Sequence, residues 1–424
     1  MAAGSATATD DTDRAVGLEE AVEHVSRSAL RAGTVGRVGL ELEAHLVDLR
    51  DLRSRVPWPR VQAAVDGVGA WPGGSQVTVE PGGQLELSGP PATDAGAAVR
   101  ALRADRAALT TALAREGLGT ALLGADPVRP PQRVNPAPRY AAMERHFAAV
   151  ACADAGATMM TSTAALQVNL DAGPPAGWRD RVTLAHRLGP VLVAMSACSP
   201  LLAGRDTGWR SARQQTWGDL DQSRCGPLLG RHDPAEEWAA YALAAPVMLV
   251  QRADGGAEAV HTRTSFAEWV TGAVPLGGRR PTTADLDRHL STLFPPVRLR
   301  GYLEIRYLDA APEPWWPALA AVTTALLDDP GAADDAWAAT APVAGAWDRA
   351  ARLGLTDDAL RDAALACLSA AAPAVAPDLH PEVDALLALV HEGRSPGDAL
   401  RAVAASDDPL DLLDAAISSP GTDA

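Results

Sequence analysis

The sequence contains no lysine, so all 37 basic residues are arginine. It therefore has neither a Walker A lysine nor a lysine amine for a Schiff base, which excludes P-loop and pyridoxal-dependent mechanisms. Asparagine is also scarce, occurring only at positions 135 and 169. The abundance of Ala, Gly, Pro, Arg and Asp indicates codon bias from a GC-rich genome. The missing lysine thus restricts the chemistry more than it informs the fold.

Long apolar runs and paired cysteines are absent as well. The most apolar stretch, residues 188–202, is shorter than the roughly 20 residues that span a bilayer. Pro190 and Pro200 flank it, which favours a buried helix. The four cysteines show no CxxC pair or disulfide-like spacing, as expected in a reducing cytoplasm. Residues 1–14 lack a basic start and an apolar core, so we expect a disordered tail rather than a signal peptide.

Acidic residues outnumber basic ones by 53 to 37, giving a formal net charge of -16 at pH 7. Nucleic acids and anionic membranes bind clustered positive charge, so neither is an expected partner. The length of 424 residues and the hydrophobic content of 47% suit a large globular domain with a sizeable core. Nothing in the sequence indicates an oligomeric state.

Helices and strands interleave without the regular alternation of parallel-sheet folds. We expect helices at 16–32, 92–117, 140–152, 179–198, 236–244 and 283–293. Strands are expected within 36–90 and at 163–171, 246–251 and 301–308. Residues 126–139 and 203–235 are predicted loops, and the chain beyond Pro312 is almost entirely helical. This order favours an α+β fold with a largely antiparallel sheet and a helical C-terminal third.

Four predicted strands carry polar residues on one face and apolar residues on the other, because residues two apart share a face. The polar positions are Glu41 and Glu43; Gln84, Glu86 and Ser88; Gln167, Asn169 and Asp171; and Glu304 and Arg306. In any single strand this pattern is typical of a solvated sheet face. Glu, Gln, Asn and Asp are poor strand formers, however, and their recurrence on four strands indicates one shared functional surface.

If these strands lie in one sheet, five carboxylates converge: Glu41, Glu43, Glu80, Glu86 and Glu304. Carboxylates packed together raise one another's pKa, and cations relieve their repulsion. Oxygen ligands without Cys or paired His point to Mg²⁺ or Mn²⁺, and Mg²⁺ is commonly bound together with substrate phosphates, which implies a nucleotide. Arg306 shares a face with Glu304 and is a candidate for contacting a transferred phosphate.

The segments GLELE, VEPGGQLELSG, PRYAAM, MMTSTAALQVNLD and YLEIR occur in this order between residues 39 and 306. In order and separation they resemble the glutamate–cysteine ligases of the plant-like branch, most of all the actinobacterial group that serves ergothioneine synthesis. The resemblance implies a glutamine-synthetase-like fold: a curved antiparallel sheet with helices on its outer face and metals and ATP on its concave face. It also implies one cytoplasmic catalytic domain over 15–420, with motifs in 38–312 and helices in 313–420.

The resemblance further implies that ATP converts the γ-carboxylate of glutamate into an acyl phosphate, which the cysteine amine attacks. Arg306 and Glu304 would be catalytic, with Arg306 stabilising the transferred phosphate. Gln167 and Asn169 would lie near the metals or the nucleotide. The metal ligands would be Glu41, Glu43, Glu80, Glu86 and Glu304. The substrate contacts would be Arg139, Tyr140 and Arg224, the last through a bidentate fork to the α-carboxylate of glutamate.

The sequence departs from the plant pattern after the paired methionines, where Thr161-Ser162-Thr163 replaces Arg-Thr-Cys. A substrate contact through that arginine, or redox control through that cysteine, is therefore not supported. Two alternatives stay open. One is a ligase of the same fold that joins glutamate to another amine, since the acyl phosphate forms independently of the nucleophile. The other is a non-catalytic metal- or nucleotide-binding relative, which predicts degraded carboxylates, whereas all five are present.

Overall fold

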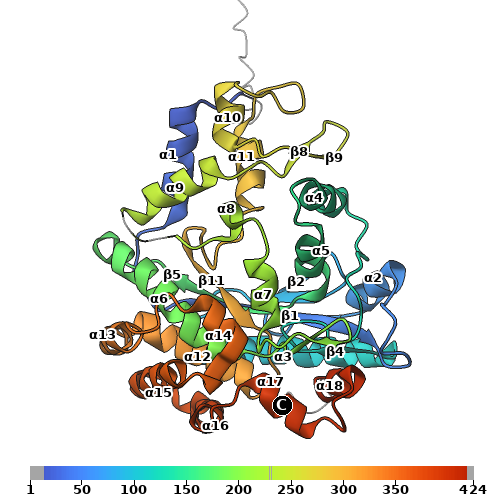
Figure 1. Ribbon diagram of the computed structural model, residues 1–424, viewed down its shortest axis with the longest axis vertical. Helices are drawn as coiled ribbons and strands as arrows, with labels where there is room; N and C mark the ends of the chain where they lie inside the picture. Colours follow the sequence, from blue (N-terminus) through green and yellow to red (C-terminus); the bar gives the residue numbers. More distant parts are fainter. Residues whose placement is uncertain (1–13, 229, 231, 418–424) are drawn as a thin grey trace, which may run out of the picture.

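The computed structural model describes residues 14–228, 230 and 232–417. A seven-stranded sheet with the order β10-β11-β5-β1-β3-β2 crosses the molecule, and β4 pairs with the second half of β1 (Figure 1). Every neighbouring pair in it is antiparallel. The strands are β1 Val38–Asp48, β2 Gln76–Val79, β3 Leu85–Ser88, β4 Leu118–Ala121, β5 Ala165–Asp171, β10 Val297–Leu299 and β11 Tyr302–Asp309.

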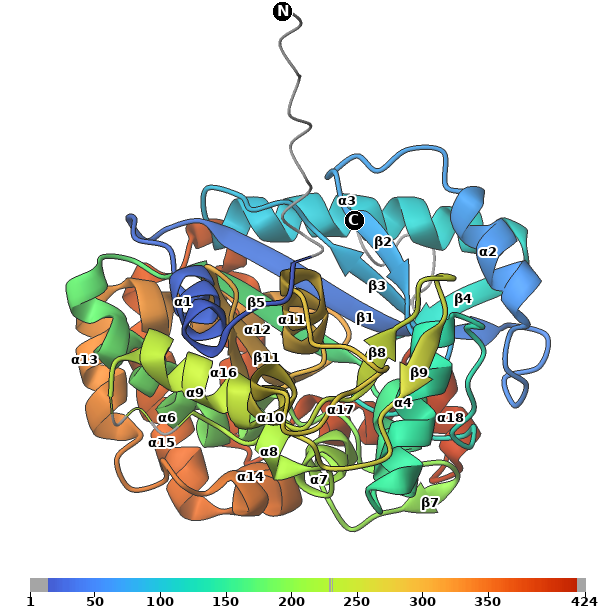
Figure 2. The same cartoon turned by 90° about the horizontal axis from the view of Figure 1, so that it is seen from above.

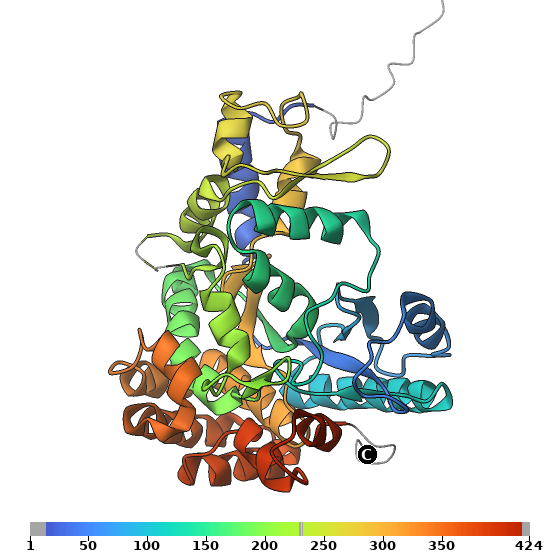
Figure 3. The ribbon, with the colours of Figure 1, turned by 45° about the vertical axis from the view of Figure 1, so that its right-hand side comes forward.

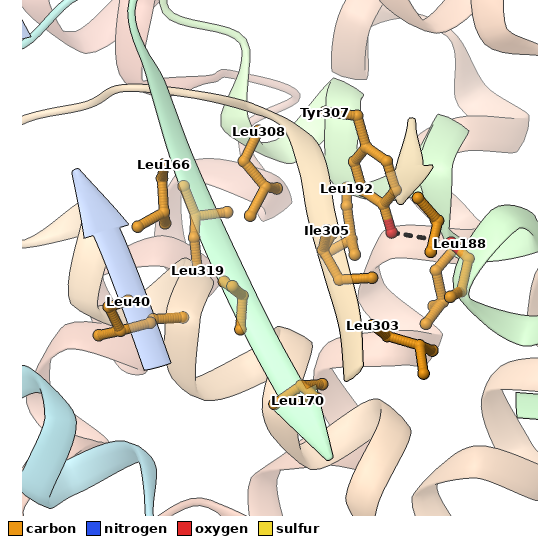
Figure 4. Packing of buried hydrophobic residues seen from close by; sticks show 14 of the residues in the cluster. Leu40, Leu166, Leu170, Leu188, Leu192, Leu303, Ile305, Tyr307, Leu308 and Leu319 are labelled. Carbon is orange, nitrogen blue, oxygen red and sulfur yellow. Dashed lines mark hydrogen bonds between the residues drawn. The ribbon is translucent and has the colours of Figure 1, made fainter. Parts of the chain in front are cut away.

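The outer face of the sheet is apolar, as the alternation of the strands requires. Leu40, Leu166 and Leu303 from three neighbouring strands belong to one buried cluster with Leu192 and Leu319 from the helices behind them (Figure 4). Burying a leucine side chain contributes about 1.5–3 kcal/mol, so this layer fixes which face of each strand points inward. The polar residues are thereby forced onto the opposite face.

Helices cover both faces of the sheet. On the outer face lie α3 (Ala95–Arg115), α6 (Trp178–Ser196) and α12 (Trp315–Asp328), with α13 (Pro330–Ala339), α15 (Asp358–Ala371) and α16 (His380–His391) packed around them (Figures 1 and 3). On the polar side lie α4 (Pro138–Ala149), α5 (Ala153–Ser162), α7 (Ala212–Gly218) and α8 (Gln222–Cys225) (Figure 1).

A further group of elements lies above α7 and α8 in Figure 1 and in front of the sheet in Figure 2. It comprises α1 (Leu18–Ala29), α9 (Pro234–Ala244), α10 (Phe266–Thr271), α11 (Thr283–Leu290) and the hairpin of β8 (Leu249–Gln251) and β9 (Ala257–Ala259). The remaining elements of the described residues are α2 (Trp58–Asp66), β6 (Leu201–Leu202), β7 (Arg205–Asp206), α14 (Trp347–Leu353), α17 (Pro396–Val403), α18 (Pro409–Ala415) and short 3-10 turns at Pro175–Gly177, Gly354–Thr356, Ala372–Ala374 and Pro377–Leu379.

The α+β fold, the antiparallel sheet and the helical C-terminal part predicted from the sequence are confirmed for the described residues. The loop predicted over 203–235 is wrong, because it contains α7 and α8. Ser211 caps α7 by accepting from the amide of Gln214, and Asp221 caps α8 by accepting from Ser223. Pro190 lies inside α6, within the helix predicted over 179–198. All but the last residue of the predicted tail 1–14, and residues 418–420, lie outside the described part.

The sequence showed no disulfide-like cysteine spacing and no apolar run long enough to span a bilayer, and the structure can be compared with both observations. Cys198, Cys225 and Cys367 are buried and Cys152 is half-buried, and all four thiols are free. Within the described ranges, no helix combines the length and hydropathy needed to cross a bilayer.

Candidate active site

The structure brings the polar residues of the four strands onto one face. Glu43 lies directly opposite Glu86 across β1 and β3, and Glu41 lies opposite Gln167 across β1 and β5. On β11, Glu304 lies opposite Asn169. The predicted convergence of these strands is confirmed, whereas the chemical roles of the residues stay predictions.

A cavity of about 350 Å³ lies over this face, between the sheet and the segments around α4, α5, α7 and α11. It contains Glu80 and Glu86, from the two arms of the hairpin that β2 and β3 form, together with arginines from several elements. Its lining consists of Glu41, Glu43, Glu80, Pro81, Gln84, Glu86, Arg139, Tyr140, Met143, Met159, Met160, Thr163, Gln167, Arg213, Trp217, Ser291, Phe294, Arg298, Arg300 and Arg306.

One side of the cavity, which we call the acidic wall, consists of Glu41, Glu43, Glu80 and Glu86. Burial, with repulsion from Glu304 and Glu86, raises the pKa of Glu41 to about 7. Burial and neighbouring carboxylates also raise the pKa of Glu43, of Glu86 and, most strongly, of Glu80. These groups are held in an environment that disfavours four negative charges.

The acidic wall is held in place by neutral hydrogen-bond donors. Glu43 accepts from the amide of Ala165 at 2.8 Å and from Nε2 of Gln167 at 3.1 Å. Asn169 donates to Glu41 at 2.8 Å, and Oγ1 of Thr78 donates to Glu86 at 2.9 Å. Such donors orient carboxylates without neutralising them, so the negative charge stays available to a cationic ligand.

The turn between Glu80 and Gln84 positions the hairpin arms. The amide of Glu80 donates to the carbonyl of Gln84 at 2.8 Å, and that of Gly83 donates to the carbonyl of Glu80 at 2.9 Å. Gly83 has φ of +88°, and a Cβ on Gly82 would lie 2.2 Å from the carbonyl oxygen of Thr161. The turn therefore needs glycine at both positions. Arg55 adds a bond from Nη1 to the carbonyl of Gly82 at 3.2 Å.

Across the cavity, Glu304 is surrounded by Arg298, Arg300 and Arg306, which we call the arginine cluster. The Glu304 carboxylate is fully buried and lies 2.9 Å from Nη2 of Arg298, 3.3 Å from Nη1 of Arg300 and 3.1 Å from Nη1 of Arg306. Burial alone would raise the pKa of Glu304, but Arg298 and Arg306 outweigh it and hold that pKa far below its ordinary value. Nη1 of Arg306 also donates to Oε1 of Gln167 at 2.6 Å.

The donor set of the acidic wall fits a divalent cation chemically. Carboxylate oxygens are ligands that Mg²⁺ and Mn²⁺ prefer, and a cation would relieve the repulsion that raises the pKa values of this cluster. Among the residues that the structure describes, no three His, Cys, Asp or Glu side chains are already gathered as a metal site. Glu41, Glu43 and Glu86 instead accept hydrogen bonds from amides and hydroxyls, so a bound cation would compete with these donors.

The predicted substrate-contacting residues divide into two groups. Arg139 and Tyr140 line the cavity, and Nη1 of Arg139 donates to Oγ of Ser291 at 3.0 Å. Arg224 does not line it: its guanidinium is fully buried and donates to the backbone carbonyls of Thr292 and Pro246. The predicted contact of Arg224 with a substrate carboxylate is thus not supported by its present position.

Asn169 lies at the edge of a second cavity of about 500 Å³ rather than in the first. Glu41 and Arg300 line both cavities, so the two adjoin at these residues. The predicted place of Asn169 near a nucleotide is compatible with this second space.

The sequence did not identify Arg213, Arg298 or Arg300 as site residues. Arg298 lies on a three-residue strand, which is too short to show alternation. Arg213 lies on α7, within the segment predicted as a loop. The one available signal was Arg298-Leu-Arg300, whose spacing of two would place both arginines on one face of a strand.

The sequence matches glutamate–cysteine ligase family 2 (GCS2) over residues 37–414. It is 55% identical over 382 residues to the glutamate–cysteine ligase EgtA of Mycolicibacterium smegmatis, covering 90% of each chain. To EgtA of Mycobacterium tuberculosis it is 52% identical over 381 residues, covering 89% of this chain and 88% of that one. The chloroplastic glutamate–cysteine ligase of Brassica juncea is 31% identical over 287 residues, which cover 66% of this chain and 55% of the plant protein.

The chain therefore belongs to glutamate–cysteine ligase family 2, as the resemblance in its motifs implied. Solved structures agree at the level of fold. The glutamate–cysteine ligase of Francisella tularensis, solved in complex with AMP, superposes with a TM-score of 0.57 at 13% identity and covers 91% of this chain and 88% of its own. The bifunctional glutathione synthetase of Pasteurella multocida superposes with a TM-score of 0.51 at 14% identity, covering 94% of this chain and 52% of its own.

Proposed function

We propose that this protein is an ATP-dependent glutamate–cysteine ligase. The proposal rests on the membership of this protein in glutamate–cysteine ligase family 2. It also rests on a cavity in which the acidic wall lies opposite the arginine cluster. Ligation of this kind requires phosphate oxygens, a carboxylate and an amine to be held together. The cavity supplies carboxylates for a cation and guanidinium groups for anions within one enclosed space.

The proposed reaction has two steps. The γ-carboxylate oxygen of glutamate attacks the γ-phosphorus of ATP, ADP leaves, and an acyl phosphate forms. The amine nitrogen of cysteine then attacks the acyl carbon, the C–O bond to phosphate breaks, and the amine loses a proton. Arg306 stabilises charge on the transferred phosphate, because its guanidinium lines the cavity beside Gln167.

A divalent cation, Mg²⁺ or Mn²⁺, would neutralise phosphate charge when held by Glu41, Glu43, Glu80 and Glu86. Glu304 was predicted as a fifth ligand, and its three arginine partners support a different contribution, the positioning of Arg306. The AMP found in the Francisella tularensis ligase supports ATP as the nucleotide here. Gln167 and Asn169 orient the acidic wall beside it.

We also propose that residues 15–420 form one catalytic domain, since the helices after Pro312 pack on the outer face of the motif-bearing sheet. The enzyme would act in the cytoplasm on small-molecule substrates. Its resemblance to the actinobacterial group supports ergothioneine synthesis as the destination of γ-glutamylcysteine. Deleting the gene in its host should abolish ergothioneine, and restored ergothioneine on feeding γ-glutamylcysteine would place the defect at this step.

The direct test is incubation of the purified full-length chain with glutamate, ATP and Mg²⁺, adding one amine at a time. Cysteine should give γ-glutamylcysteine by mass spectrometry and ADP in equal amounts. If cysteine released no more ADP than the other amines, the alternative of a ligase for a different amine would replace this proposal. Omission of Mg²⁺ with added chelator should stop turnover.

A further inference from the structure

Two buried hydrogen-bond donors in the cavity have no acceptor. They are Nη1 of Arg213 and Nε1 of Trp217, both shielded from solvent. The two residues lie four apart on α7, so they share one face of the helix, and both line the cavity. Buried donors without a partner are uncommon in native proteins, because each forfeits its hydration. A bound ligand would supply the missing acceptor.

The position of Arg213 is fixed by its other contacts. Its side chain is only 3% exposed, and Nη2 donates to the backbone carbonyl of Arg306 at 2.7 Å. The nearest carboxylate oxygen to Nη1 is Oδ1 of Asp309, at 3.8 Å, which is beyond hydrogen-bond distance. Asp309 is already engaged by the hydroxyls of Ser199 and Ser211, at 2.6 and 2.9 Å. The guanidinium is thus held in place, and its Nη1 takes part in an ion pair with Asp309 but forms no hydrogen bond.

The surroundings indicate which anion fits. The guanidinium carbon of Arg213 lies 5.9 Å from the ring centroid of Trp217, whose own ring is 5.9 Å from that of Phe294. Met159 and Met160 line the same cavity. A guanidinium and an indole N–H set among apolar side chains suit a small organic carboxylate attached to an apolar stem, because a planar carboxylate accepts from two donors at once.

The other cavity arginines are engaged elsewhere. Arg298, Arg300 and Arg306 bind Glu304, and Arg139 donates to Ser291. We therefore propose that Arg213 and Trp217 together bind the α-carboxylate of an amino-acid substrate. This inference rests on the proposed ligase function. Glutamate and cysteine both carry that group, and the experiment below distinguishes them.

The test compares each substrate with an analogue that lacks only the α-carboxylate. Cysteamine replaces cysteine, and 4-aminobutyrate replaces glutamate. In the wild-type enzyme kcat/KM should favour the true substrate in both pairs. In Arg213→Gln, this preference should fall about 10- to 100-fold for one pair, because a charge-assisted hydrogen bond to the carboxylate is lost. The pair that responds identifies the substrate. If an analogue turns over too slowly, its competitive inhibition constant gives the same comparison.

Trp217→Phe is the second variant, since it keeps an aromatic ring and removes the indole N–H. It should reduce the same preference about 2- to 10-fold, as expected for a neutral hydrogen bond. Arg213→Lys should recover part of the preference by restoring the charge. Gln215→Ala, on α7 but outside the cavity lining, is the matched control and should leave both preferences unchanged.

A general structural defect lowers kcat/KM for a substrate and its analogue alike and leaves their ratio intact. If Arg213→Gln and Trp217→Phe both left the two ratios unchanged, the carboxylate assignment would be wrong. If Arg213→Gln did not fold, the ratio in Trp217→Phe would decide alone. Wild-type activity with glutamate and cysteine tests the ligase function separately, so failure of the inference and failure of the function give different results.

Discussion

Both the acidic wall and the arginine cluster contain a buried glutamate, and the pKa values of these glutamates are shifted in opposite directions. Glu41 on β1 has a pKa of about 7, whereas the pKa of Glu304 on β11 is held far below its ordinary value. Both carboxylates are desolvated. They differ in their partners, since Glu41 faces other carboxylates and an amide, and Glu304 faces three guanidinium groups.

This difference separates two uses of buried charge. The arginine cluster is satisfied within the protein, so it forms a rigid structural unit that holds Arg306 in position. The carboxylates of the acidic wall repel one another until a cation arrives, so the wall is destabilising on its own and available for binding. Residues that weaken the fold for the sake of a ligand are a common feature of functional sites.

Glu304→Gln should produce the largest effect. It leaves three arginines around a neutral group, and breaking a buried ion pair costs about 3–5 kcal/mol. We expect this loss in the free energy of unfolding by urea titration, together with loss of ADP release. Glu23→Gln, which removes a surface pair with Arg27, is the control and should change stability by less than about 0.5 kcal/mol. Normal stability in Glu304→Gln would show that the arginine cluster is not a structural unit.

Glu86→Gln should have the opposite effect on stability while still impairing catalysis. The amide oxygen can still accept from Thr78 and Ser88, so those two bonds survive, while the charge and the 3.4 Å bond from Nε2 of Gln167 are lost. We expect turnover to fall about 100- to 1000-fold, as for other groups that stabilise transition-state charge. The melting temperature without metal should rise or stay the same. Retained turnover at saturating Mg²⁺ would contradict the acidic wall as the cation site.

The pH dependence of stability should distinguish the two regions. The pKa of Glu41 is raised from 4.5 to about 7, so the folded state holds a proton that the unfolded state has released. Its contribution is therefore present at low pH and lost as pH rises from 4.5 to 7, by on the order of 3 kcal/mol. The difference in unfolding free energy between wild type and Glu41→Gln, followed from pH 4.5 to 8, isolates this contribution.

Mg²⁺ should reverse that loss, because it pairs with the ionised carboxylates. It should stabilise the wild type more at pH 8 than at pH 5, and less in Glu41→Gln. A pH-independent difference between wild type and Glu41→Gln would contradict the raised pKa.

Arg300→Gln should give the smallest effect. The Arg300 side chain is 53% exposed, compared with 10% for Arg298, so water screens its pairing with Glu304. We expect a loss below about 1 kcal/mol in urea unfolding. Arg298→Gln should cost several times more. If the two variants lost the same unfolding free energy, burial would not determine how much each arginine of the cluster contributes to stability.

Much of the sheet was predictable, because period-two alternation is visible in β1, β3, β5 and β11. The four-residue strand β4 is buried at every position and was not predicted. Leu40 and Leu42 opposite Glu41 and Glu43 identified both the core face and the polar face of β1. The VEPGGQLELSG segment contains the polar positions of β3 and the Pro81-Gly82-Gly83 turn before it. These patterns lie within short stretches of sequence, so they can be recognised without knowledge of the tertiary structure.

Of the arginines across the cavity, Arg306 was predicted from the polar face of its strand, whereas Arg213, Arg298 and Arg300 were not identified. Arg298 and Arg213 lie on elements of three and seven residues, where no periodicity develops. Their proximity to the acidic wall results from long-range pairing of β10 with β11 and from the packing of α7. Arg224 is the converse case, since the resemblance implied a substrate contact, which stays a prediction, whereas the fold places its guanidinium against backbone carbonyls.

The uneven burial of the four thiols has a practical consequence. Burial raises the pKa of Cys198, Cys225 and Cys367, which keeps these thiols protonated and shielded. Cys152 alone is half-buried, and it immediately precedes α5, the helix that carries Met159 and Met160 into the cavity. A maleimide dye should therefore attach at Cys152 first and place a fluorescent reporter on the element that lines the site, with no engineered cysteine.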